Sequence, residues 1–144
     1  MLVALAPKGY WSADSQGLAL AVEELADAPL IGLSSSDPLA AQVGQYLKNL
    51  EPAPRTSIRV QTYSLARAMV ESGAGLALID PFTAQGSAQT LVRPLDPALP
   101  ITLYALTRAH ESQPHTLDDL LQLFSERAEE QIAHVSRASR LEKR

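Results

Sequence analysis

The chain has 144 residues, of which 46% are hydrophobic and 19% are charged, and this balance predicts one soluble domain with a core large enough to fold unaided. It contains no cysteine, which excludes disulfides, thiolate metal sites and a cysteine nucleophile and is typical of a reducing compartment, so a cytoplasmic location is expected. The net charge of −4 and the lack of any apolar run of about 18 residues argue against a nucleic-acid-binding face and a membrane span.

Short apolar runs mark the expected strands, and each is bounded by proline, glycine or polar turn residues. The first three strands are predicted over residues 2–6, 30–33 and 58–61, and a fourth begins at Gly75. Two more strands are expected over residues 90–95 and 101–107, on either side of a proline-rich turn.

Helical patterns separate these strands. Residues 18–25 predict one or two helical turns. Asp37 suits an N-cap and Pro38 suits the first helical position, so a helix is expected over residues 38–50. The alternation of strands and helices predicts an α/β layered domain whose strands are mostly parallel.

Two later helices have apolar faces. The first carries Leu65, Ala66, Met69 and Val70 on one side and is closed by Gly73. The second, over about residues 116–136, carries an apolar stripe from Leu117 to Val135. A stripe of that length is unfavourable in water unless another surface covers it.

Polar residues follow three of the predicted strands. They are Ser34, Ser35 and Ser36 after the second strand, Thr62 and Tyr63 after the third, and Asp80, Phe82 and Thr83 after the fourth. Small ligands bind at the carboxyl ends of strands in an open α/β sheet. The sequence therefore predicts a ligand pocket formed by these eight residues.

Each group also has a purely structural interpretation. The three serines are able to hold a carboxylate at a helix start or simply to cap that helix, and the carboxylate of Asp37 would compete with a bound anion. Thr62 is either a ligand contact or the N-cap of the next helix, and Tyr63 is either a contact or a half-buried aromatic. Asp80 either pairs with an ammonium group or caps the local backbone. Both interpretations stay open.

Motifs for metal binding or catalysis are weak. His110, His115 and His134 show no i, i+4 pairing, so no metal site is expected. The glycines at 73 and 75 follow a helix, whereas a dinucleotide-binding fingerprint precedes one. There is no Gly-x-Ser-x-Gly elbow, although a triad assembled from distant residues stays an open alternative. We therefore expect no cofactor and no enzymatic activity.

Several segments resemble the effector-binding domain of LysR-type transcriptional regulators. Residues 70–81, Val-Glu-Ser-Gly-Ala-Gly-Leu-Ala-Leu-Ile-Asp-Pro, look like that family's helix, tight turn, strand and proline. Residues 25–31 resemble its segment leading into a strand, and residues 91–95 and 103–108 resemble the strands that return to its first lobe. Residues 33–38, together with residues 80–83, are similar to the branch that senses opines and basic amino acids.

The resemblance covers residues 2 to about 128 and matches only the later part of such a regulator. It implies a lobe of the periplasmic-binding-protein type II-like fold, a Rossmann-like mixed sheet flanked by helices, with a truncated first lobe. About residues 8–102 would form the second lobe, residues 1–7 and 103–110 the crossover strands, and residues 116–136 the C-terminal helix of the first lobe. DNA contact would come from an N-terminal domain of the intact regulator and not from this chain.

The implied partner is a small-molecule effector, such as an amino acid, an opine or a carboxylate, bound between two lobes near the eight polar and aromatic residues named above. A homo-oligomer is also expected, because self-association would cover the stripe of the last helix. Two alternatives remain. The same architecture serves solute-binding proteins of transport systems, although residues 1–11 lack a secretory signal pattern. An α/β enzyme is the other alternative, since fold does not fix function.

Overall fold

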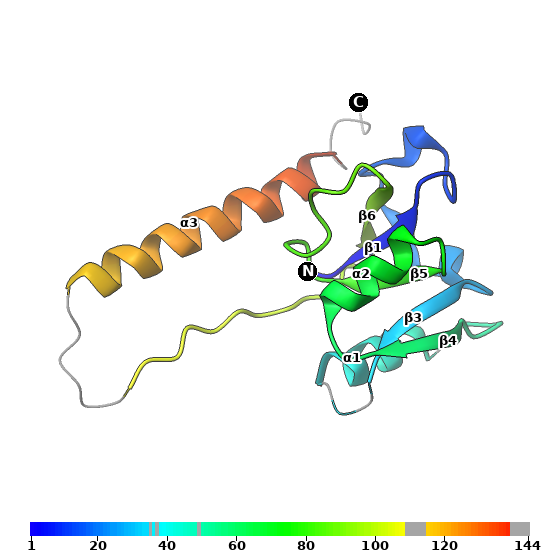
Figure 1. Cartoon of the computed structure of the whole chain (residues 1–144), viewed down its shortest axis with the longest axis horizontal. Helices are drawn as coiled ribbons and strands as arrows, with labels where there is room; N and C mark the ends of the chain where they lie inside the picture. The colour runs from blue at the N-terminus through cyan, green and yellow to red at the C-terminus, as the bar shows by residue number, and fades with distance from the viewer. Residues whose placement is uncertain (35, 37, 49, 109–114, 139–144) are drawn as a thin grey trace.

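The core of the protein is one mixed β-sheet, shown in Figure 1. The computed structural model describes residues 1–144 except 35, 37, 49, 109–114 and 139–144. Within the described residues the strands are β1 (Val3–Pro7), β2 (Leu20–Ala21), β3 (Pro29–Leu33), β4 (Arg55–Val60), β5 (Leu76–Ile79) and β6 (Thr90–Asp96). Their spatial order is β2-β6-β1-β5-β3-β4.

Strand direction in the sheet is mostly uniform, as predicted. The pairs β2–β6, β3–β4 and β3–β5 are parallel, whereas β1 is antiparallel to both β5 and β6. Among the described strands, β1 therefore runs against all the others. The carboxyl ends of β3, β4 and β5 consequently lie along the same edge of the sheet.

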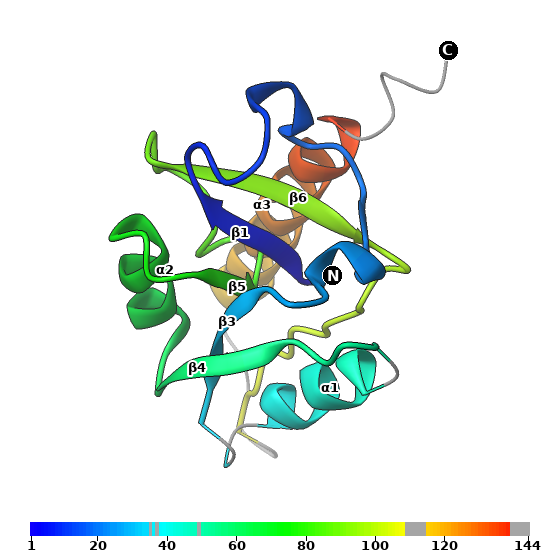
Figure 2. The ribbon, with the colours of Figure 1, turned by 90° about the vertical axis from the view of Figure 1, so that its right-hand side faces the viewer.

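Helices cover both faces of the sheet, because its strands bury side chains in both directions. Along β1 and the residue before it, Leu2, Ala4 and Ala6 enter one core cluster, while Val3 and Leu5 enter the other. Helix α1 (Pro38–Leu47) packs Val43 and Leu47 against the first cluster. Helix α2 (Tyr63–Glu71) packs Ala66 and Val70 into the second. Figure 2 shows these two helices on opposite sides of strands β3 and β5.

Local sequence explains where α2 begins and ends. The Thr62 side chain accepts a hydrogen bond from the Leu65 backbone N–H at 3.2 Å, so Thr62 is the N-cap. Gly73 has a φ of 83°, and the Gly73 and Ala74 N–H groups donate to the carbonyls of Val70 and Met69. The predicted closure of this helix by Gly73 is confirmed. Gly75 is also required, because a Cβ there would collide with the carbonyl oxygen of Pro29.

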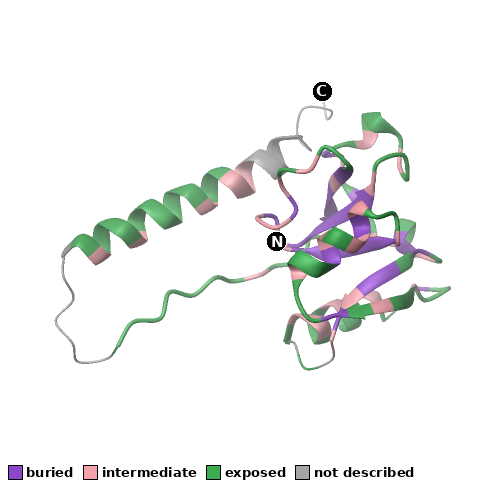
Figure 3. Ribbon diagram, in the orientation of Figure 1, coloured by how far each residue is buried: buried purple, intermediate pink, exposed green. Residues whose placement is uncertain are grey.

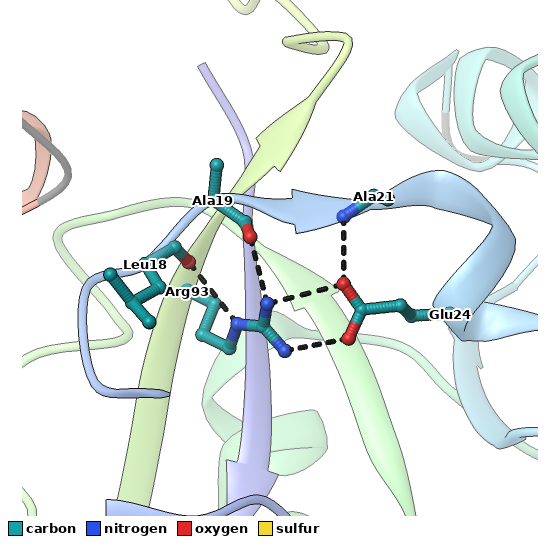
Figure 4. Close-up of polar contacts among 5 residues, drawn as sticks. All are labelled: Leu18, Ala19, Ala21, Glu24 and Arg93. Atoms are coloured by element: carbon teal, nitrogen blue, oxygen red, sulfur yellow. Dashed lines mark hydrogen bonds and ion pairs between the residues drawn. The ribbon is translucent and has the colours of Figure 1, made fainter. Parts of the chain in front are cut away.

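Arg93 of β6 holds the segment before β3 against the sheet (Figure 4). Its guanidinium donates to the carbonyls of Leu18 and Ala19 at 3.1 and 2.7 Å. It also forms a two-bonded ion pair with Glu24 at 2.9 and 3.2 Å. Glu24 in turn accepts a hydrogen bond from the Ala21 N–H. Residues 18–25 were expected to form one or two helical turns. In the structure this segment contains strand β2 and then a 3-10 helix, η2 (Val22–Leu25). An earlier 3-10 helix, η1, covers Ala13–Ser15.

The predicted strand over residues 101–107 is wrong. Residues 101–108 form neither helix nor strand, and their side chains from Thr102 onward are exposed. Alternating apolar residues alone do not make a strand when no partner strand supplies hydrogen bonds. The first long helix is also shorter than predicted, since α1 ends at Leu47 and not at residue 50. Asp37, its expected N-cap, lies outside the described residues.

The last helix, α3, extends over His115–Ala138 and is mostly exposed, as Figure 3 shows. Its later part contacts the body of the domain, where the Gln85 side chain donates to the Gln131 carbonyl at 3.5 Å. Its earlier part exposes Leu120, Leu123 and Phe124. None of the described helices has the length and apolar character needed to cross a membrane.

Candidate functional site

A cavity of about 740 Å³ opens at the edge of the sheet where β3, β4 and β5 end. This is the edge at which open α/β sheets bind small ligands. Its walls come from the first turns of α1 and α2, from the turn after β5, and from the extended segment that follows β6. The lining residues are Pro38, Leu39, Gln42, Tyr63, Asp80, Phe82, Pro100, Ile101, Thr102, Leu103 and Tyr104.

Three of the eight residues predicted from sequence meet in this cavity, namely Tyr63, Asp80 and Phe82. Tyr63 is the first residue of α2, and the other two belong to the turn after β5. β3 lies between β4 and β5 and is parallel to both, so residues far apart in sequence reach the same edge. The sheet topology thus brings this part of the predicted site together.

Asp80 stabilises its own turn through one of its two carboxylate oxygens. Its Oδ1 accepts hydrogen bonds from the backbone N–H groups of Phe82 and Thr83 at 2.9 and 2.8 Å. No hydrogen bond to Oδ2 is formed by any residue that the structure describes. The structural interpretation of Asp80 is therefore correct for Oδ1, and the residue also lines the cavity. Asp80 is the one ionisable carboxyl among the described lining residues, which include no arginine, lysine or histidine.

Ser34, Ser36, Thr62 and Thr83 do not line the cavity. The hydroxyls of Ser34 and Ser36 are 3.2 Å apart, and the Ser34 N–H continues the β3–β4 pairing by donating to Val60. Thr62 caps α2. The Thr83 N–H donates to Asp80. Ser35 lies outside the described residues.

The turn that carries Asp80 is attached to α2 through Arg67. The Arg67 guanidinium donates to the carbonyls of Thr83 and Gln85 at 3.1 and 2.8 Å, and to the Glu71 carboxylate at 2.8 Å. Hydrogen bonds from the Arg67 and Ser87 side chains lower the pKa of Glu71 below its usual value. Arg67 thereby fixes the end of the turn relative to the helix that presents Tyr63.

Sequence reasoning missed the parts of the lining that come from α1 and from residues 100–104. Gln42 follows Pro38 by four residues, so the helical period places both on one face of α1, but no pattern in the sequence marks that face as part of a site. The sequence pattern predicts a strand for Thr102, Leu103 and Tyr104. These residues line the cavity because the segment instead runs along it without pairing to the sheet. No group of three or more potential metal ligands occurs in the part of the chain that the structure describes.

An α/β lobe with a cleft at the carboxyl edge of its strands defines a ligand-binding domain, and comparisons with known proteins agree. Residues 1–129 match the family described as LysR substrate binding domain. The chain is 30% identical over 122 residues to the HTH-type transcriptional regulator DgcR of Pseudoalteromonas sp., a match that covers 83% of this chain and 41% of DgcR. The chain therefore spans less than half the length of that relative.

Solved structures show the same fold. The regulatory domain of CcmR from Synechocystis PCC6803, in complex with 2-PG, is 10% identical with a TM-score of 0.59 over 98% of this chain and 64% of that one. The BenM effector-binding domain with its effector benzoate is 17% identical with a TM-score of 0.55 over 65% of this chain and 44% of that one. At these identities the likeness concerns the fold alone.

The chain belongs to the LysR substrate-binding domain family. It has the mixed sheet flanked by helices of the periplasmic-binding-protein type II fold. That family is a domain of transcriptional regulators and not a family of enzymes.

Proposed function

We propose that the cavity beside Asp80 binds a small effector that carries an ammonium or guanidinium group, such as an amino acid or an opine. The observation that carries the proposal is the charge of the lining, in which Asp80 is the one ionisable carboxyl and no described residue is cationic. A carboxylate that keeps a free oxygen beside an apolar cavity favours a cation. A purely anionic effector would meet this charge unfavourably.

Tyr63 and Phe82 suit the same effector. Both are partly buried and line the cavity beside Asp80, so their rings offer an apolar surface to an aliphatic stem or a π face to a cation. We propose direct effector contact for Tyr63, Asp80 and Phe82. Ser34, Ser35 and Ser36 follow β3 outside the lining, and we propose that they contact a polar end of an effector that extends out of the cavity, while Thr62 and Thr83 hold the turns that present the site.

The arrangement of the intact regulator is part of the proposal. About residues 8–102 form the second lobe, residues 1–7 and 103–110 cross between lobes, and residues 116–136 belong to the first lobe. An effector that binds both lobes would shift the equilibrium between their arrangements and so act on a DNA-binding segment elsewhere in the regulator. This role implies a cytoplasmic location and requires no catalysis by the chain. DgcR and the effector complexes of BenM and CcmR support such a role.

Calorimetric titration of the chain with L-lysine, L-arginine and glutarate tests the proposed effector class. We expect a basic amino acid to bind and glutarate not to bind. Asp80→Asn keeps an acceptor for the Phe82 and Thr83 N–H groups but removes the charge, so it should weaken binding about tenfold, as loss of a charge-assisted hydrogen bond does.

Asp14→Asn is the matched control, because Asp14 is exposed in η1 and does not line the cavity. It should leave the affinity unchanged. Binding of glutarate with no response to either basic amino acid, or equal affinities for Asp80→Asn and the unmodified chain, would contradict the proposed class.

We further propose that the chain self-associates through the apolar face of α3. Leu123 and Phe124 are 61% and 63% exposed there. Exposed apolar side chains grouped on one helix face are typical of an interaction surface. A second copy of the chain would cover this face.

A further inference from the structure

A second cavity, of about 130 Å³, lies between α1 and the strands β3 and β4. It shares no lining residue with the cleft at Asp80. Its walls are mostly apolar. The lining residues are Leu30, Ile31, Gly32, Leu33, Ala40, Val43, Gly44, Leu47, Thr56, Arg59 and Leu78.

The space exists because α1 presents small side chains to the sheet. Ala40 and Gly44 lie one helical turn apart and both line the cavity. A Cβ added at Gly44 would meet no atom within 4 Å. None of the described residues of α1 is fully buried, so the helix lies over the sheet without filling the gap.

A β-bulge in β4 lies beside this cavity. The pairing of β3 with β4 shifts between Leu30 and Ile31, so that Leu30 pairs with Thr56 and Gly32 pairs with Arg59. Side chains alternate along a regular strand, in which Thr56 and Arg59, three residues apart, would point to opposite faces. With the bulge, both residues line the same cavity.

Arg59 supplies the one charge in the lining. It forms no ion pair with any residue that the structure describes. Thr56 is the other polar side chain among the lining residues. A mostly apolar cavity whose lining arginine has no ion-pair partner among the described residues is complementary to a carboxylate with a compact apolar body.

We propose that this cavity is a second ligand site, which takes a small monocarboxylic acid with a branched aliphatic body. The acid places its apolar carbons between α1 and the sheet and its carboxylate against Arg59. The volume suits such a body, because a cavity of about 150 Å³ holds a benzene molecule. Its charge preference is opposite to that of the cleft, where Asp80 lies.

Helix α1 is a common wall of the two sites. Pro38, Leu39 and Gln42 face the cleft, whereas Ala40 and Val43 face the second cavity. A ligand in the second cavity would therefore contact α1, the helix whose first turn also lines the cleft.

The test is an NMR titration of the methyl-labelled chain with isovalerate, with 3-methylbutan-1-ol as the uncharged analogue. Isovalerate should shift the Val43 and Leu47 methyl signals in a saturable way, and the alcohol should bind more weakly. Arg59→Gln should weaken isovalerate binding about fivefold, because the variant loses the contribution of one solvent-exposed ion pair to the affinity. The affinity for the alcohol should not change. Ala40→Leu should reduce binding of both compounds, because it fills the cavity.

Arg55→Gln is the matched control, since Arg55 lies in the same strand, is exposed and does not line the cavity. It should bind isovalerate as the unmodified chain does. Methyl signals that do not saturate, or an Arg59→Gln affinity equal to that of Arg55→Gln, would overturn the proposal. Because Asp80 is not involved, this outcome is independent of the result for the cleft.

Discussion

At the scale of single residues, Arg93 shows how one side chain joins distant segments. Its side chain is 7% exposed, while that of Glu24 is 46% exposed. Besides that ion pair and two carbonyl contacts, its Cζ lies 5.2 Å from the centre of the Trp11 ring. The planar guanidinium serves these partners at once, which a lysine ammonium does not do.

Arg93→Met should lower the free energy of unfolding by about 2–3 kcal/mol, because it leaves the Leu18 and Ala19 carbonyls without their donor and Glu24 without its partner. Urea denaturation measures the change. Arg127→Met is the control, since its ion pair with Glu130 is exposed on both sides and should contribute less than about 1 kcal/mol. Equal losses in the two variants would show that the Arg93 contacts add nothing beyond a surface pair.

Tyr46 makes a comparable connection between α1 and the turn after β6. Its hydroxyl donates to the Pro97 carbonyl at 2.6 Å. Burial, together with the negative charges of Asp96 and Glu23, raises the pKa of Tyr46 to about 12. The hydroxyl therefore keeps its proton, and with it the hydrogen bond, throughout the neutral range.

At the scale of secondary-structure elements, Gly44 and Gly73 allow the effect of backbone conformation on stability to be distinguished from the effect of steric clashes. A Cβ at Gly44 or at Gly73 would meet no atom within 4 Å. Gly44 lies inside α1, whereas Gly73 has a φ of 83° at the end of α2. Any difference between the two alanine variants must then come from the backbone.

Gly44→Ala should raise the free energy of unfolding by about 1 kcal/mol, since alanine loses less backbone entropy than glycine in a helix. Gly73→Ala should lower it by about 1 kcal/mol, because an L-residue is strained in the left-handed region. Thermal or urea unfolding of both variants gives the comparison. Shifts in the same direction would mean that conformation is not the deciding factor.

At the scale of the whole molecule, the exposed apolar residues form two neighbouring groups. Leu120, Leu123 and Phe124 lie on α3, and Leu103, Tyr104 and Leu106 lie on the extended segment that leaves the sheet. A further cavity of about 290 Å³ between Phe82, Leu103 and Phe124 connects the two groups.

The proposed self-association predicts a mass that rises toward that of a dimer as the chain is concentrated, measured by light scattering. The double variant Leu123→Gln with Phe124→Gln should remain a monomer, because it removes the apolar face. Leu65→Gln is the control, since Leu65 is an exposed leucine on α2, away from this face. A monomer at every concentration of the unmodified chain would refute the proposed contact.

Part of the candidate site was predictable because it depends on local chemistry. Thr62 caps α2 through a bond to a residue three positions away, and Asp80 holds its turn through bonds two and three positions away. Tyr63, Asp80 and Phe82 follow apolar strands, and parallel strands end at one edge. The contribution of residues 100–104 was not predictable, because an unpaired apolar segment has the same pattern as a strand.

The sequence by itself determined the alternation of strands and helices, the end of α2 at Gly73 and the polar residues at the strand ends, since these follow from side-chain period, backbone conformation and hydrogen bonds within a few residues. Only the tertiary structure decided the reversed direction of β1, the contacts of Arg93 with residues about seventy positions away, and the bulge in β4 between Thr56 and Arg59. These features depend on which distant segments pair and in what register, and no local pattern of side chains specifies that choice.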